Sequence, residues 1–503
     1  MSAAHKKDDT RLSLKTWMTA LLSLYTTALY GSAVTVAGAV LPQIQGDLSA
    51  SLDQMSWIVT ASVVAGAIGT PPTPWLSSRF GRKTMLLVCI AGLTVTSVLI
   101  GTATGLGEMV AWRVCQALMG APIIVLTQAM MLDAFPSTHR GLGLSIWTIG
   151  ISGGWVLGPT FGTLIVEWSN WRVAFLVYAP LGLLGVVLCA FILPQQRKNA
   201  SLTFDWMGFF ALSVALAGIQ LVLNRGQRLD WFESTEVLIA CFFIVAASYF
   251  FVAHSITTRN PFINWQVFRD RNLVIGIIIM SLYAYISLAP LILIPTMLQY
   301  LRGYELVAIG LLLVPRGIAQ ILATILMGGI IDRIEPRILI AFGLIGFGVS
   351  CSLMAQFNLD IVASDLMFPT ILQGISMAFI TVPAMSVAYA TVNSSFRTDA
   401  ATLVGLAYTL ASSAGVAVAV LILTRSTQTN MEEFVGHVVP GNELLNYPEY
   451  AASWDLTNLE SLAAIHGEIS QQAMMIGYVN VYWMMAALCV VVFPLVFFIG
   501  KRS

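Results

Sequence analysis

Residues 74–104 read PWLSSRFGRKTMLLVCIAGLTVTSVLIGTAT, a basic turn followed by an uncharged and largely apolar run from 84 to 104. An apolar run of about 20 residues is long enough to cross the hydrocarbon core of a bilayer, about 30 Å thick, as one α-helix. The segment therefore predicts a transmembrane helix with a cationic turn at one end. Similar apolar runs recur along the whole chain.

The composition also indicates a membrane protein. Charged residues make up 10% of the 503 residues and hydrophobic residues 57%, whereas soluble domains carry roughly 25% charged residues. The mean hydropathy is +0.82. We predict an all-α polytopic membrane protein with fourteen transmembrane helices. The expected spans are 17–41, 54–78, 84–104, 109–131, 141–166, 173–193, 206–224, 235–254, 273–297, 307–331, 338–358, 366–392, 400–424 and 474–499.

The charged residues predict the orientation and exclude several functions. An even number of spans puts both tails on one side, and 18 Lys or Arg fall on that side against 5 on the other. Cytoplasmic loops are the basic ones, so both termini are predicted in the cytoplasm. The net charge is zero, so nucleic acid is not an expected partner. We find no phosphate-binding loop, nucleophile elbow or cluster of metal ligands, and expect no enzyme, cofactor or metal.

The chain contains an internal repeat. PWLSSRFGRK at 74–83 matches GGIIDRIEPR at 328–337 at an offset of 254, and Gln116 matches Gln373 at an offset of 257. Facing repeats around a midplane site are the architecture of secondary transporters. The predicted organisation is a tail (1–16), a six-helix half (17–193), a two-helix insertion with flanking cytoplasmic loops (194–272) and a second six-helix half (273–499).

One predicted external loop, 425–473, is long and acidic, and its later half reads as a short helix. We expect a lid over the external mouth, a docking surface for a partner, or a solvated connector.

Several motifs together resemble a known family. They are RFGRK between the second and third spans, Arg113 with Gln116 and Gly120 in the fourth, and GGWVLGPTFG at 153–162 in the fifth. WRVAFLVYAPLG, NRGQRLDW, LLLVPRGIA and QQAMMIGYVNVYW follow in order. The set resembles the major facilitator superfamily, specifically its fourteen-helix drug:proton antiporters of the EmrB/QacA type, over nearly the whole chain.

The resemblance implies export of amphipathic organic compounds across a bacterial inner membrane by alternating access, coupled to proton entry. It also implies an EmrA-like periplasmic adaptor that feeds an outer-membrane channel. A glycine stripe allows close helix approach and a proline bends a helix, which suits a moving joint. The residues expected to act in the conformational switch are Arg79, Gly81, Arg82, Gly154, Gly158, Pro159, Gly162, Asp332 and Arg333.

The chain departs from this family in its acidic residues. Ala33 stands where the first helix commonly carries an aspartate, Gly38 replaces an asparagine, and Asn480 replaces an acid of the last helix. Ser78 replaces the aspartate of the basic turn, and Ala117 replaces a glycine of the fourth-helix motif. On the predicted topology no carboxylate falls at the membrane midplane, which leaves a helix-end carboxylate as the proton site if protons are coupled at all.

Two arginines, Arg113 and Arg316, lie deep in predicted spans. A charge at that depth costs at least about 2.5–3.5 kcal/mol, so it needs a partner or a wet cavity. Arg113 either braces backbone carbonyls or Gln116, reaches Glu108, or binds an anionic substrate, and Arg316 has the same options. An alternative function is therefore export of organic anions such as fatty acids, siderophores or acidic drugs, driven by the membrane potential at about 2.3 kcal/mol per charge per 100 mV.

Aromatic residues within the spans could stack on an amphipathic ligand, although each could equally serve in packing. The predicted substrate-binding residues combine them with the deep polar ones. They are Arg113, Gln116, Trp112, Tyr30, Trp155, Tyr283, Tyr285, Arg316, Gln373 and Tyr408. A receptor that binds without transport is less favoured, because the cytoplasmic loops are too short for a signalling segment.

Overall fold

The computed structural model describes residues 12–195, 203–258, 261–331, 333–438 and 458–498, and every regular element in these ranges is a helix. The elements before residue 200 are α1 (Leu14–Leu48), α2 (Leu52–Gly69), α3 (Thr73–Phe80), α4 (Arg82–Thr102), α5 (Leu106–Ala134), α6 (Arg140–Trp168), α7 (Trp171–Leu176) and α8 (Tyr178–Ile192). They are followed by α9 (Trp206–Arg225), α10 (Thr235–Thr257), α11 (Arg271–Arg302), α12 (Leu306–Ile330), α13 (Pro336–Met354), α14 (Ala363–Tyr389), α15 (Arg397–His437) and α17 (Leu459–Val492). Short 3₁₀ turns, including η5 (Ser394–Phe396) and η7 (Phe493–Phe498), join or end them.

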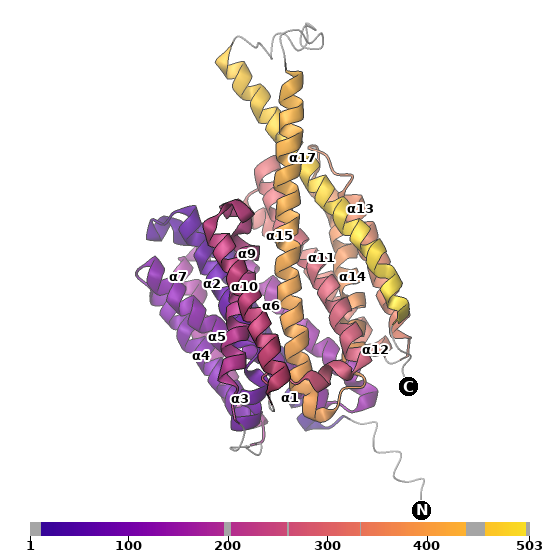
Figure 1. Ribbon diagram of the computed structural model, residues 1–503. Helices are drawn as coiled ribbons and strands as arrows, with labels where there is room; N and C mark the ends of the chain where they lie inside the picture. Colours follow the sequence, from indigo (N-terminus) through magenta and orange to yellow (C-terminus); the bar gives the residue numbers. More distant parts are fainter. Residues whose placement is uncertain (1–11, 196–202, 259–260, 332, 439–457, 499–503) are drawn as a thin grey trace, which may run out of the picture.

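The helices lie side by side in one bundle, and α1 begins at the end of the bundle where α17 finishes (Figure 1). We call this end the tail side and the opposite end the far side. Thirteen helical segments of the described residues are long and apolar enough to cross a membrane, and α2 is a shorter apolar helix. The fourteen expected spans therefore all correspond to helices.

The second and sixth expected spans are interrupted, which the sequence interpretation did not anticipate. The predicted helix 54–78 is two helices, because α2 ends at Gly69 and α3 starts at Thr73. Pro71 and Pro72 lie between them, and a proline has no backbone N–H to continue the helical ladder. The predicted span 173–193 is likewise divided into α7 and α8 at Val177.

The last two helices are longer than predicted. The expected spans 400–424 and 474–499 are parts of α15, which runs to His437, and of α17, which starts at Leu459. The described flanks of the expected loop 425–473 are thus continuations of transmembrane helices, and residues 439–457 lie outside the described residues. The short helix predicted in its later half is present as the first turns of α17. Both continuations project past the rest of the bundle on the far side (Figure 1). We call them the far-side extension.

The most extensive helix contact among the described residues joins α1 and α6. A Cβ atom added at Gly150, Gly154 or Gly158 would lie 2.5–2.7 Å from a backbone oxygen of α1. Glycines at four-residue spacing therefore let the two backbones meet, as small residues do at membrane helix interfaces. Asn480, at the family position of an acid, donates a hydrogen bond to Ser426 and so joins α17 to α15.

The two helices between the repeats, α9 and α10, pack against each other, and α9 also packs on α2 and α15. Arg225 at the end of α9 lies over the Trp57 ring of α2 at 4.3 Å and pairs with Glu236 of α10 at 3.3 Å. At their other end Asp205 caps α9 and pairs with His254 at 2.8 Å. Most of α10 is exposed and apolar, which is the surface expected toward lipid.

Candidate functional site

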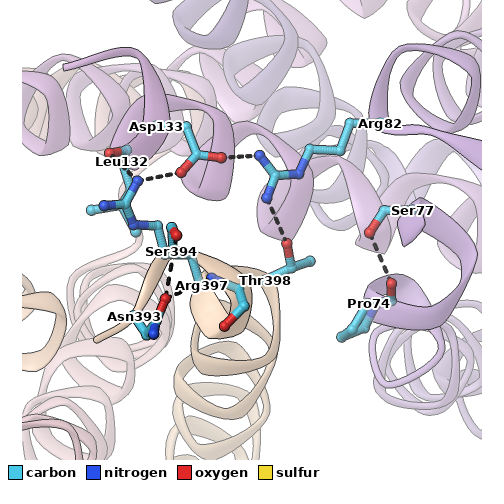
Figure 2. A network of polar contacts seen from close by, with 10 residues as sticks. Pro74, Ser77, Arg82, Leu132, Asp133, Asn393, Ser394, Arg397 and Thr398 are labelled. Carbon is cyan, nitrogen blue, oxygen red and sulfur yellow. Dashed lines mark hydrogen bonds and ion pairs between the residues drawn. The ribbon is translucent and has the colours of Figure 1, made fainter. Parts of the chain in front are cut away.

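A polar network joins the two repeats at the tail side (Figure 2). Asp133, at the end of α5, forms ion pairs with Arg82 at the start of α4 and with Arg397 at the start of α15. Arg82 also donates to the Thr398 hydroxyl at 3.2 Å, and Arg397 donates to the Leu132 carbonyl at 3.0 Å. One carboxylate therefore holds a cation from each half of the chain, which fastens the halves together. We call this network the tail-side gate.

The contact between the halves continues inward from the gate. Tyr389 of α14 donates to the amide oxygen of Gln128 of α5 at 3.1 Å, and both side chains are buried. Deeper still, Gln320 of α12 donates to the Ser152 hydroxyl of α6 at 3.1 Å. The halves thus touch from the tail side to about the middle of the bundle.

The predicted switch residues of the basic turn are positioned by Gly81. This residue has φ +87° and joins α3 to α4, a backbone conformation that favours glycine. Arg82 faces the gate, whereas Arg79 lies near the Trp75 and Phe80 rings at 5.4 and 5.9 Å. In the second copy of the turn Arg333 is exposed, and Asp332 lies outside the described residues. The predicted switch residues therefore do not form a single cluster.

The other predicted switch residues lie along α6. Gly154, Gly158 and Gly162 face α1, where an added Cβ would meet Ala28, Ser32 and Val36 atoms. Pro159 lies on another face of α6 and lines a pocket. The motif thus divides between a helix contact and a cavity wall.

Arg113 is held by protein atoms. Its guanidinium donates to the Ala33 carbonyl at 3.1 Å, the Gln116 amide oxygen at 2.5 Å and the Val34 carbonyl at 3.4 Å, and the residue is 3% exposed. Gln116 in turn donates to the Ser97 hydroxyl at 2.7 Å. Among the alternatives for this charge, the geometry favours the brace.

Glu108 does not reach Arg113, because its carboxylate accepts hydrogen bonds from Thr104 and Trp112 near the start of α5. The alternative that paired Arg113 with Glu108 is therefore wrong.

A pocket lies between the two repeats at mid-depth, lined by α6, α11 and α12 and by Met377 of α14. Its cavity volume is about 100 Å³. Its tail-side wall contains Ser152, Gln320 and Arg316, and its far-side wall is mostly aliphatic. Arg316 is the only charged side chain among the residues that line it. Ligand pockets have this balance of a largely apolar wall and a few polar groups.

The structure brings together some of the predicted substrate-binding residues. Trp155, Tyr283 and Arg316 line the pocket, and the Tyr408 ring lies 6.0 Å from that of Trp155 and 6.4 Å from that of Tyr283. Gln373 of α14 is buried, and its neighbour Gly374 packs against the backbone of Arg316. Apart from Trp155 of α6, these residues come from the second half, and together they are the part of the predicted site that the structure brings together.

Other predicted substrate-binding residues are not among those that line this pocket. Tyr30 packs against Gly120 in the first half, and the Trp112 indole N–H donates a hydrogen bond to the Glu108 carboxylate. Arg113 and Gln116 lie in the buried network described above, and Tyr285 contributes a backbone contact to Gly415. The sequence showed these residues to be inside the membrane but not which face of each helix they occupy.

Of the gate residues, sequence reasoning singled out Arg82 but neither Asp133 nor Arg397, and it missed the polar tail-side wall of the pocket. Arg397 lies at the offset of 257 from Arg140 that also relates Gln373 to Gln116, so the repeat contained the signal. Ser152, Ser287 and Gln320 carried no such signal, because single polar residues are common in transmembrane helices. Within the described ranges, no group of three or more His, Cys, Asp or Glu side chains is placed to hold a metal ion.

Two repeats fastened at one end, with a pocket between them at mid-depth, define the architecture of an alternating-access transporter. The chain belongs to the Major Facilitator Superfamily, whose family model matches residues 23–315.

Its curated relatives include proteins named multidrug export protein EmrB. The chain is 28% identical to the multidrug export protein EmrB of Haemophilus influenzae, over 90% of this chain and 89% of that protein. It is 27% identical to EmrB of Escherichia coli K12, over 92% and 91%. It is also 25% identical to the fatty acid resistance protein FarB of Neisseria gonorrhoeae, over 92% of both.

Solved structures show the same fold. The proton:xylose symporter XylE bound to a bromodeoxyglucose is similar with a TM-score of 0.64 at 14% identity, covering 98% of both chains. The human organic anion transporter MFSD10 is similar with a TM-score of 0.61 at 13% identity, covering 94% of this chain and 99% of that one. At such low identity these structures bear on the fold alone.

Proposed function

We propose that the protein is a secondary active exporter of amphipathic organic compounds in a bacterial inner membrane, with both termini in the cytoplasm. The pocket is the observation that carries this proposal. It lies between the repeats and combines a polar tail-side wall with a mostly aliphatic far-side wall. The Trp155, Tyr283 and Tyr408 rings lie beside it. The names of the EmrB and FarB relatives support the same class of substrate.

The tail-side gate supplies the conformational step. With Arg82 and Arg397 bound to Asp133, the halves are joined at the end predicted to face the cytoplasm. Breaking the Arg397–Asp133 ion pair and the Arg82–Thr398 hydrogen bond, which cross between the halves, would let 17–193 and 273–499 rock apart there and receive substrate from the cytoplasmic side. Remaking them would close that side again, which is alternating access. We propose that the insertion 194–272 stays docked through α9 during this movement.

Proton coupling is part of the proposal. On the predicted topology no acid lies at the midplane, so a proton must act at a helix-end carboxylate. The alternative is export of organic anions driven by the membrane potential, which needs no proton site. Arg316, the charged residue of the pocket, favours that alternative.

Transport in everted membrane vesicles tests the proposal. A compound that is pumped into energised vesicles and releases protons from them establishes proton-coupled export. Uptake of anions that follows the membrane potential and persists after the pH gradient is collapsed establishes the alternative. If no anionic, neutral or cationic amphiphile accumulates above vesicles that lack the protein, export is rejected. A reporter fused to the C-terminus tests the orientation separately.

We further propose an EmrA-like periplasmic adaptor and an outer-membrane channel as partners. The far-side extension supports this, since it projects past the bundle and carries exposed apolar side chains such as Val435 and Leu462. Co-purification of the intact protein with a coexpressed adaptor is the direct test.

A further inference from the structure

The two buried arginines occupy corresponding places in the two repeats. Arg113 donates to the carbonyl of Ala33 in α1, and Arg316 donates to the carbonyl of Ser287 in α11 at 3.4 Å. Ala33 and Ser287 are related by the repeat offset of 254. The arginines themselves are not equivalent by sequence, because one comes from α5 and the other from α12.

The groups around each arginine also correspond. In the first half the Gln116 side-chain amide donates a hydrogen bond to the Ser97 hydroxyl. Their counterparts in the second half are Gln373 and Cys351, at offsets of 257 and 254, and Cys351 lies close to both Gln373 and Arg316. Each half therefore surrounds a buried guanidinium with a first-helix carbonyl, a glutamine and a small polar side chain.

The two networks differ in how completely they are bonded. In the first half the guanidinium donates to three oxygen atoms, and Gln116 uses both ends of its amide. In the second half Arg316 has the long bond to Ser287 and a 3.4 Å contact with the Met377 sulfur. Neither amide atom of Gln373 has a well-formed hydrogen bond among the described residues, and the Tyr482 hydroxyl beside Arg316 has none there either.

The two networks also differ in what they face. Arg316 lines the pocket together with Tyr283 and Ser287. Arg113 does not line this pocket, and its guanidinium is enclosed by protein oxygens. A buried cation that has few hydrogen bonds to its own protein, and that faces a cavity without any acid in its wall, can pair with water or with an anion from elsewhere.

We propose that Arg316 binds the anionic head group of the transported compound, with the Tyr283 and Ser287 hydroxyls beside it, and that Arg113 is its structural counterpart without a ligand. The substrates are then amphiphiles with one carboxylate or similar oxyanion. A guanidinium presents paired N–H donors that match the two oxygens of such a group. The apolar part lies against Leu288, Leu291 and Leu313 on the far-side wall. This inference rests on the proposed export function and names its substrate class.

Matched C12 amphiphiles test the assignment. Binding of radiolabelled dodecanoate to the full-length protein in nanodiscs is measured at a pH where the carboxylate is ionised, with empty nanodiscs subtracted. Dodecanol and dodecyltrimethylammonium compete as the neutral and cationic analogues. We expect the wild type to bind dodecanoate most tightly.

Arg316→Gln should weaken dodecanoate binding by about 10- to 100-fold, the usual effect of losing a charge-assisted hydrogen bond. Dodecanol should be affected far less, because its contacts are apolar. Arg316→Lys keeps the positive charge but loses the paired N–H donors of the guanidinium. It should therefore restore part of the preference for the anion.

Arg113→Gln is the matched control, since it removes the other buried arginine. It is expected to reduce thermal stability while leaving the ratio of anion to neutral affinity at the wild-type value. A merely structural role for Arg316 predicts instead that Arg316→Gln weakens all three amphiphiles in parallel. That result, or unchanged dodecanoate binding, overturns the assignment.

The outcome is separable from that of the proposed function. If the wild type binds dodecanoate through Arg316 but no amphiphile accumulates in energised vesicles, the anion site stands and the export function fails. If amphiphiles are transported but Arg316→Gln leaves the preference among anionic, neutral and cationic compounds unchanged, export stands and the anion site fails.

Discussion

Arg113 shows how one buried charge is accommodated without a carboxylate. At position 33, where the family commonly places an aspartate, the backbone carbonyl of an alanine accepts the guanidinium. Gln116 and Val34 supply the other acceptors. Arg113 and Gln116 of the fourth-helix motif are present, while the side chain at position 33 has no carboxylate that could pair with the guanidinium.

Arg113→Gln is therefore predicted to destabilise the protein more than Arg316→Gln. The first change removes three hydrogen bonds to oxygen and leaves the Gln116 amide oxygen without its donor, which should cost about 1–3 kcal/mol. The second removes one long bond to oxygen and a contact to sulfur. Thermal unfolding of the two purified variants in the same detergent checks this, and equal or reversed losses would show that Arg113 is not the brace.

At the scale of elements, the α1–α6 contact depends on glycines at particular positions of α6. A Cβ at Gly154 would lie 2.5 Å from the Ala28 carbonyl oxygen, whereas a Cβ at the adjacent Gly153 would have no atom within 4 Å. Both residues are buried and helical. Substituting each of them by alanine therefore distinguishes the effect of close helix packing at Gly154 from the effect of replacing any helical glycine.

Gly154→Ala should lower the free energy of unfolding by about 1–3 kcal/mol, because the backbones of α1 and α6 must separate to admit the methyl group. Gly153→Ala should be neutral or slightly stabilising, since alanine favours a helix more than glycine does. Thermal unfolding and vesicle transport of both variants provide the measurement. Equal behaviour of the two would contradict the packing role of the stripe.

For the molecule as a whole, the tail-side gate is the contact that must open if the two halves are to separate at the tail side. Asp133 receives two cations from opposite repeats, and all three side chains are partly exposed. Partly exposed pairs contribute up to about 1 kcal/mol each. Such a gate can hold the halves together and still open on a modest change in conditions.

Asp133→Asn is predicted to shift the protein toward a state that is open at the tail side, by up to about fivefold. The reporter is a disulfide between cysteines placed at Gly141 and Ile331, where an ideal Cβ at 141 lies 3.3 Å from that of Ile331. In a background without native cysteines, the cross-linking yield should fall. Asp47→Asn is the control, because Asp47 pairs with Arg172 within one half. An unchanged yield for Asp133→Asn would exclude the gate.

The far-side extension bears on assembly. Val435→Glu combined with Leu462→Glu changes exposed apolar side chains that project beyond the bundle. If an adaptor binds there, protection of whole cells against an exported compound should be lost while transport in everted vesicles stays at the wild-type level. Equal protection by the variant and the wild type would argue against docking at this surface.

The sequence by itself determined the all-helical membrane architecture, the fourteen apolar segments and the family. These follow from run length, composition and local motifs, because a bilayer requires each spanning segment to satisfy its own backbone hydrogen bonds. Only the tertiary structure decided which face of each helix is turned inward. It separated Arg113, enclosed by carbonyls, from Arg316, which lines the pocket, and it joined Asp133 to Arg397 across 264 positions of sequence. A uniformly apolar helix has no amphipathic pattern to fix its rotation, so packing between helices sets it.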